Sequence, residues 1–139
     1  MNTKKFFIGG IVGGIIYLLL GWLAYGKLLV DYFSKHHGIT SGFMRDPTAM
    51  PFLAYLILGN LLSGFLLAYV FAKATVNSFG SGLVAGGIIG FLVSSGYDCI
   101  NYATTTLMSR PEILADVITY TIISAITGAI IGAIGSGKE

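Results

Sequence analysis

The sequence predicts an all-α integral membrane protein in which four membrane-spanning helices form one bundle over residues 1–139. Of the 139 residues, 55% are hydrophobic and only 10% are charged, whereas soluble domains carry about 25% charged residues. So few charges cannot cover a surface that faces water, so the lipid bilayer is the expected partner for most of the outside. Four stretches also reach the roughly 20 apolar residues that a helix needs to cross the hydrocarbon layer.

The four predicted spans cover about residues 6–26, 51–72, 80–108 and 113–135. Each is continuously apolar rather than alternating, which favours helices over barrel strands. The first is longer than the core of a signal peptide and no clean cleavage site follows it, so we expect it to stay on the chain. Ser109 and Glu112 have the spacing of a capping box before the fourth span, with Pro111 in its first turn.

An even number of spans places both termini on one side of the membrane. The eight Lys and Arg residues divide equally between the two sides, but the early pair Lys4–Lys5 favours a cytoplasmic N-terminus under the positive-inside rule. The segment 27–50, after the first span, carries apolar and aromatic residues at helical spacing. It predicts either an interfacial helix in the headgroup layer or an extension of the first helix into water.

Small residues recur at helical spacing in three spans, mainly in the half of the membrane nearest the termini. The series are Gly9, Gly10, Gly13 and Gly14, then Gly82, Gly86, Gly90 and Ser94, then Ser124, Gly128, Gly132 and Ser136. Such series let helix backbones approach closely in lipid, so they predict a tight, dry bundle at that end. The same Gly-rich faces are candidates for contacts in a homo-oligomer or a larger membrane complex.

A short repeat accompanies the glycine series. The tetrapeptide Gly-Gly-Ile-Ile occurs at residues 13–16 and again at 86–89, early in the first and the third span. This pattern would fit a duplicated helical hairpin with parallel topology, although the second and fourth spans do not align well.

The opposite half of the membrane is polar. In the third span, Ser94, Asp98, Asn101 and Thr105 follow one stripe at i, i+4, i+7 and i+11. The other spans add polar and aromatic side chains at similar depth. The sequence therefore predicts a polar pocket, open to the non-terminal side, with these candidate ligand-binding residues: Asp98, Asn101, Asn60, Thr105, Ser94, Tyr25 and Trp22.

Asp98 is the residue that most needs a partner. In a span that runs to residue 108 it lies ten residues from the end, about 15 Å deep, where an ionised Asp costs roughly 2.5–3.5 kcal/mol. No Lys or Arg lies at matching depth, so the expected partners are Asn60, Asn101 or a tyrosine hydroxyl. Asp98 either binds a proton, a cation or a ligand's donor group, or it is a strut between the second and third spans. An interhelical polar bond contributes only about 0.6 kcal/mol, which favours binding.

Several functional classes are disfavoured by the sequence. The small net charge of +2 forms no basic stripe, so nucleic acid is not an expected partner. The single cysteine, Cys99, has no partner for an internal disulfide. The adjacent residues His36 and His37 point to different faces of a helix, which argues against a metal site. No nucleophile–base motif is present, so we expect neither an enzyme nor a cofactor.

Four short runs along the chain carry a family resemblance. They are Gly21-Trp22-Leu-Ala-Tyr25-Gly26-Lys-Leu-Leu, Pro51-Phe52, Thr104-Thr105-Thr106-Leu-Met-Ser-Arg110-Pro111 and Gly128-Ala-Ile-Ile-Gly132. With these runs the chain resembles, over nearly its whole length, the uncharacterised bacterial four-span membrane proteins grouped as domain of unknown function 1761. The resemblance departs at Met108 and Ser109, where the family has an acidic residue and a glycine.

The resemblance implies a four-helix membrane fold in a bacterial inner membrane and brings no known activity. It directs interest to Trp22, Tyr25, Thr104, Thr105, Arg110 and Pro111. From the residues themselves, the leading hypothesis is a small binding or transport protein whose intramembrane pocket takes a cation, a proton or a small polar ligand. The alternative is a structural or accessory subunit of a larger membrane complex, docked through its glycine series.

Overall fold

The computed structural model describes residues 1–37 and 45–137. Its elements, in chain order, are α1 (Thr3–Leu23), the π-helical turn η1 (Ala24–Leu28), α2 (Val30–His36), α3 (Phe52–Lys73), α4 (Phe79–Thr104) and α5 (Arg110–Ser136). Within these described residues there is no strand. Four helices are long and apolar enough to cross a membrane: Thr3–Leu28, Phe52–Lys73, Phe79–Thr104 and Arg110–Ser136. The predicted all-α membrane fold with four spans is therefore confirmed.

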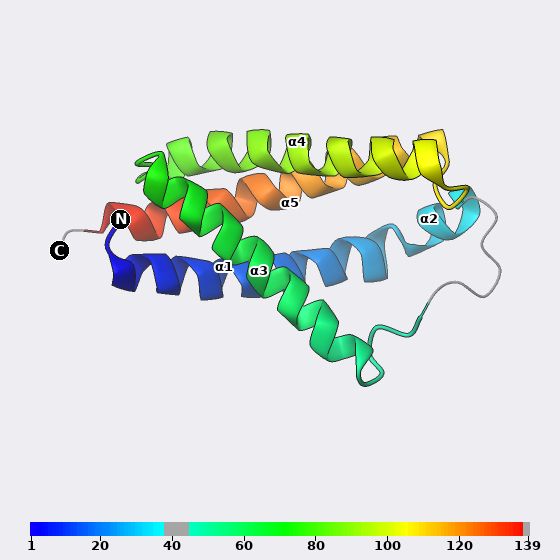
Figure 1. The fold of residues 1–139 in the computed structure, drawn as a ribbon, viewed down its shortest axis with the longest axis horizontal. Helices are drawn as coiled ribbons and strands as arrows, with labels where there is room; N and C mark the ends of the chain where they lie inside the picture. The colour runs from blue at the N-terminus through cyan, green and yellow to red at the C-terminus, as the bar shows by residue number, and fades with distance from the viewer. Residues whose placement is uncertain (38–44, 138–139) are drawn as a thin grey trace.

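The four long helices form two hairpins that meet along one seam. Helix α1 packs along α3 and helix α4 along α5, while the contact between α1 and α5 joins the pairs (Figure 1). Helix α3 touches α4 and α5 only slightly, and its N-terminal half leans away from the other three helices. The start of α1 and the end of α5 lie together at one end, where the Lys5 ammonium donates to the carbonyl of Gly137.

Glycines hold the helices together at the end near the termini. A Cβ atom on Gly86 would lie 2.9 Å from the Cα of Gly128, and one on Gly82 would lie 3.1 Å from that of Gly132. On the other hairpin, a Cβ on Gly64 would run into the backbone of Gly10 and Gly14. The glycine series therefore serves contacts within the chain, as predicted for a tight end. The association surface that we predicted from these faces is already occupied.

The two hairpins pack in the same register. The first glycine of each Gly-Gly-Ile-Ile copy faces a glycine of the next long helix, Gly13 facing Gly64 and Gly86 facing Gly128. The following glycines keep the same offset, with Gly14 against Leu61 and Gly87 against Ala125. Leu61 lies three residues before Gly64, and Ala125 lies three residues before Gly128. A Cβ on Gly13 would also meet the side chain of Ile131 of α5, and the predicted duplication of the hairpin stays a prediction.

The connection between α4 and α5 differs from the predicted span boundaries. Helix α4 ends at Thr104 rather than at residue 108, because Thr105 takes an extended conformation with φ −137° and ψ 168°. Helix α5 begins at Arg110, where the predicted capping box is confirmed: Ser109 accepts from the amide of Glu112, whose side chain accepts from the amide of Ser109. The remaining boundaries agree with the prediction to within three residues.

The segment after the first span continues α1 and then turns into a separate short helix. The π-helical turn extends the first span to Leu28, and Leu29, with φ −112° and ψ 5°, breaks the helix before α2. Helix α2 packs on the start of α5, where the Tyr32 hydroxyl donates to the carbonyl of Pro111 over 3.4 Å. It therefore covers the end of the α4–α5 hairpin. Residues 38–44 of the predicted interfacial segment lie outside the described residues.

Candidate functional site

Two carboxyl groups lie at the same level of the α4–α5 hairpin. Asp98 lies six residues before the end of α4, and Asp116 lies six residues after the start of α5. Because the two helices run antiparallel, both carboxyl groups lie about 9 Å from the helix ends. The predicted depth of about 15 Å for Asp98 is therefore wrong, since it assumed four additional residues of helix. Asp98 belongs to the outer part of the span instead of its midpoint.

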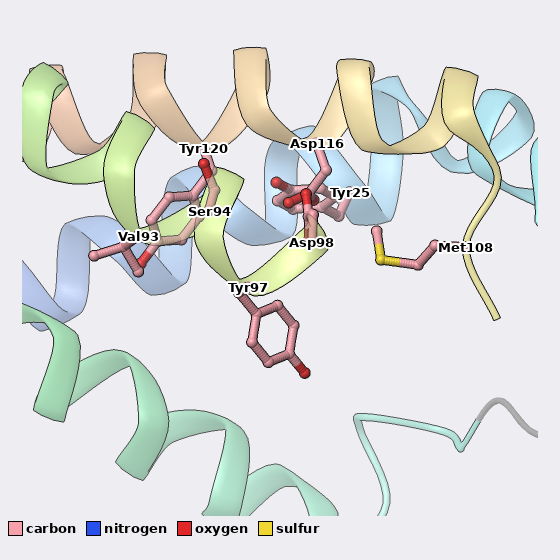
Figure 2. A pocket seen from close by; sticks show the side chains of 8 residues that line it. All are labelled: Tyr25, Val93, Ser94, Tyr97, Asp98, Met108, Asp116 and Tyr120. Carbon is pink, nitrogen blue, oxygen red and sulfur yellow. The ribbon is translucent and has the colours of Figure 1, made fainter. Parts of the chain in front are cut away.

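Asp98 is nevertheless enclosed by protein. Its side chain is only 2% exposed, and its carboxyl group is within hydrogen-bonding reach of that of Asp116. Figure 2 shows the two carboxyl groups and the Tyr25 hydroxyl pointing toward one another. Ionised carboxylates are acceptors only, so the two acids can bond to each other only when one of them carries a proton. The second oxygen of Asp98, Oδ2, has no hydrogen-bond partner among the described residues.

Tyr25 reaches this acid pair from the first span. It lies in the π-helical turn Ala24–Leu28, a kind of helix irregularity that is frequent at functional sites. Its hydroxyl lies beside Asp116 and is buried without a hydrogen bond of normal geometry within residues 1–37 and 45–137. Tyr25 and Asp98 thus each have one buried oxygen without a hydrogen bond of normal geometry among the described residues. Buried polar groups in proteins rarely lack a hydrogen-bond partner.

Three adjoining cavities meet at Tyr25. The first, of about 410 Å³, contains the acid pair and is lined by Tyr25, Val93, Ser94, Tyr97, Asp98, Met108, Asp116 and Tyr120. The second, of about 340 Å³, lies between α1, α3 and α5 and shares Tyr25 and Tyr120 with the first. The third, of about 220 Å³, shares Tyr25, Met108 and Asp116 with the first and extends toward α2. Among the described residues, no Lys or Arg lines any of these three cavities.

The third cavity is bounded by a close contact between His37, the residue after α2, and Glu112 of α5. Nδ1 of His37 lies 2.6 Å from the carboxylate of Glu112, which is only 4% exposed. Phe33 and His37 line this cavity together with Glu112 and Asp116. The short helix that follows the first span thus lies beside the acid site and lines its non-terminal side.

The structure divides the predicted site residues among the cavities. Asp98 and Ser94 line the first cavity, Trp22 and Asn60 line the second, and Tyr25 lines both. Asn101 and Thr105 line none of the three. The side chains of those two residues bond within their own segment: Asn101 donates to the carbonyl of Tyr97 and Thr105 to that of Asn101.

The neighbour of Asp98 also differs from the prediction. Asn60 donates to the carbonyl of Leu56 in its own helix and lines the second cavity, whereas Asp98 faces Asp116 of α5. The predicted strut between the second and third spans, with Asn60 as partner of Asp98, is therefore wrong. The physical reason is that α3 crosses α1 and diverges from α4.

Four further residues of the site were not predicted from the sequence. Asp116, Glu112, His37 and Tyr120 all line at least one cavity. A signal for Asp116 was present: the Ser109–Glu112 capping box marks the start of α5, and an antiparallel partner then brings Asp116 level with Asp98. The His37 contact depends on how the chain folds back after α1, which no local pattern specifies.

No family model, no curated protein and no solved structure matches this chain. The family resemblance of the sequence therefore stays a prediction, and any function has to follow from the chemistry of the cavities.

Proposed function

We propose that this chain is a small membrane binding or transport protein whose acid pair, Asp98 and Asp116, shares a proton that a small cation replaces on binding. The observation that carries the proposal is the buried, unpartnered Oδ2 of Asp98, which lines a cavity of about 410 Å³ together with a second carboxyl group. A proton or a cationic donor placed between the two acids would satisfy both.

Electrostatics support this assignment over a purely structural role. Two like charges about 4 Å apart repel by roughly 4 kcal/mol at an effective dielectric constant of 20. An interhelical polar bond between membrane helices contributes only about 0.6 kcal/mol. Two facing acids are thus a poor way to hold α4 against α5, which already pack through Gly82, Gly86 and Gly128. A positive charge between the acids turns the repulsion into attraction, so the pair suits binding.

The shape of the bundle supports one-sided access. Close glycine contacts fill the end near the termini, whereas the first and third cavities lie farther along α4 and α5, and the third extends to α2. A ligand would enter from the non-terminal side or laterally, past the exposed side chains of Val93 and Tyr97, which line the first cavity. Transport through the bundle would require the glycine-packed end to separate.

The alternative function, an accessory subunit of a larger complex, has less support. Its predicted docking surfaces were the glycine series, and these contacts are made within the chain. An accessory role would therefore have to use other helix faces, and it leaves the unpartnered acid without an explanation.

The proposal is tested by ligand-dependent thermal stability in detergent. A ligand that binds only the folded state stabilises it by about 2.7 kcal/mol at 100 times its Kd. We expect ethylammonium, Na⁺ or K⁺ to raise the melting temperature of the wild type, and Asp98→Asn to abolish that rise while keeping the basal melting temperature. The matched control is Asp31→Asn, the same chemical change at an exposed acid on α2 that lines none of the three cavities.

Two results would contradict the proposal. One is a wild-type protein whose melting temperature responds to none of these cations. The other is a response that Asp98→Asn retains or that Asp31→Asn loses equally, since neither is compatible with binding at the acid pair.

A further inference from the structure

The second cavity indicates what kind of cation the acid pair takes, an inference that rests on the function proposed above. This cavity has a volume of about 340 Å³, which falls in the range of small-molecule sites. Its walls are mostly apolar, with four aromatic residues, Tyr17, Trp22, Tyr25 and Tyr120, and one amide at Asn60. An alkali ion held between two carboxylates would leave this space unused.

The second cavity is a neighbour of the cavity that contains the acid pair. Tyr25 and Tyr120 line both cavities, and the Tyr25 hydroxyl points to the acid pair (Figure 2). The ring of Tyr120 stacks on that of Tyr17, with centroids 5.8 Å apart and an angle of 24° between the planes. Aromatic faces attract cations and offer flat apolar surface to a ligand ring. One molecule could thus place a charged end at the acids and an apolar body among the rings.

The volumes fit such a molecule. A dry apolar cavity of about 150 Å³ is large enough to bind benzene, so the second cavity has room for one aromatic ring and a short chain. The acids supply two acceptors for an ammonium group, which carries up to three N–H donors when its amine is primary. We propose that the ligand is an amphiphilic organic amine, bound as its ammonium ion, with the charge at Asp98 and Asp116 and an aryl or alkyl body in the second cavity.

The test compares three probes that separate the charge from the body: 2-phenylethylammonium, ethylammonium and 2-phenylethanol. Binding is measured by titration calorimetry on the detergent-purified protein. We expect 2-phenylethylammonium to bind the wild type about tenfold or more tightly than ethylammonium, because burying a phenyl ring is worth at least that factor. Asp98→Asn should weaken both ammonium ions and leave 2-phenylethanol unaffected.

A cavity-filling variant tests where the body binds. Gly21 lines the second cavity, and a Cβ atom there would meet nothing within 4 Å, so Gly21→Leu should fill the cavity without disturbing the helix contacts. We expect it to reduce the advantage of the phenyl group to about threefold or less and to leave ethylammonium binding unchanged. The matched control is Gly96→Leu on α4, where the space is equally open and no described cavity is lined.

The outcomes separate this inference from the function on which it rests. Equal affinity of the wild type for the two ammonium ions, or an unchanged phenyl advantage in Gly21→Leu, overturns the inference and leaves cation binding at the acids intact. Failure of both ammonium ions to bind the wild type, or their undiminished binding to Asp98→Asn, overturns the proposed function and the inference with it.

A second measurement, made on the wild type, tests the same inference if the Gly21→Leu variant fails to fold. Trp22 is the only tryptophan of the chain and lines the second cavity, so its fluorescence reports on occupancy in the wild type. The inference expects 2-phenylethylammonium to change this emission and ethylammonium to leave it constant. The same response to both probes, or none to either, would place the body elsewhere and overturn the inference.

Discussion

At the scale of single residues, the site depends on pairs of side chains that the chain brings together from distant segments. Asp98 could be nominated from the sequence because a carboxyl group in an apolar span needs a partner. Ser94 follows from the same helical stripe, and both line the cavity. Asp116 has a weaker signal in the sequence: the capping box marks the start of α5, but the level of Asp116 relative to Asp98 also depends on where α4 ends. Residues 105–109 contain no Pro or Gly that would end a helix, so the end of α4 at Thr104 had to come from the structure.

Removing the Tyr25 hydroxyl tests whether this group serves binding or folding. The hydroxyl is buried without a hydrogen bond of normal geometry in the described part of the chain, so the free protein gains little from it. We expect Tyr25→Phe to leave the melting temperature unchanged or slightly higher, and to weaken ethylammonium binding about tenfold, a loss of about 1.4 kcal/mol. Calorimetry and thermal unfolding of the same preparation would measure both. A variant that loses stability but binds normally would show that the hydroxyl has a structural role.

At the scale of the helices, the glycine spacing was the most informative feature of the sequence. Series with a four-residue repeat predicted close backbone contacts, and the structure places Gly82, Gly86 and Gly90 against Ser124, Gly128 and Gly132. The sequence did not show that Gly64, an isolated glycine of α3, completes the equivalent contact with α1. A series identifies a face of a helix, but which face it meets is decided by the packing of the whole bundle.

Adding one methyl group tests the α4–α5 contact. A Cβ atom on Gly82 would run into the backbone of Gly128, and backbone atoms cannot move aside as a side chain can. We expect Gly82→Ala to lower the free energy of unfolding by about 1–3 kcal/mol, measured by denaturation in detergent. Gly96→Ala, on the same helix with nothing within 4 Å of its Cβ position, should be neutral or stabilising because Ala favours a helix. Equal effects of the two substitutions would contradict the packing described for α4 and α5.

At the scale of the whole molecule, the bundle is closed at one end and hollow at the other. Two hairpins in matching register supply the glycine contacts at the end where both termini lie. Toward the other end the helices carry larger and more polar side chains, α3 leans away, and the three cavities surround Tyr25. The sequence predicted this asymmetry from the distribution of small and polar residues. It could not predict the direction of α3, which places Asn60 at a separate cavity.

The arrangement of the termini is a prediction for the intact membrane. Four helices are long enough to cross the bilayer, and the start of α1 lies beside the end of α5. Reporters fused to the two termini should therefore lie on the same side of the membrane. The pair Lys4–Lys5 predicts that this side is the cytoplasm. Reporters on opposite sides would contradict the four-span arrangement, whereas two reporters outside would reverse only the orientation.

The central claim is that a cation replaces a shared proton between Asp98 and Asp116. The other titratable groups near the pair are Tyr25 from the first span, Tyr120 and Glu112 from α5, and His37, which contacts Glu112. Proton release on binding distinguishes the acids from these groups when Asp98→Asn and His37→Gln are compared with the wild type. The number of protons released is obtained from calorimetric titrations in two buffers that differ in their heats of ionisation.

The number of protons released when ethylammonium binds is the most direct measurement of this claim. The wild type and His37→Gln should each release about one proton per ammonium ion, because the ammonium ion takes the place of the one proton that two facing acids need in order to bond to each other. Asp98→Asn should release none. Binding to the wild type without proton release, or release that persists in Asp98→Asn, would contradict the claim that the acid pair is the binding site.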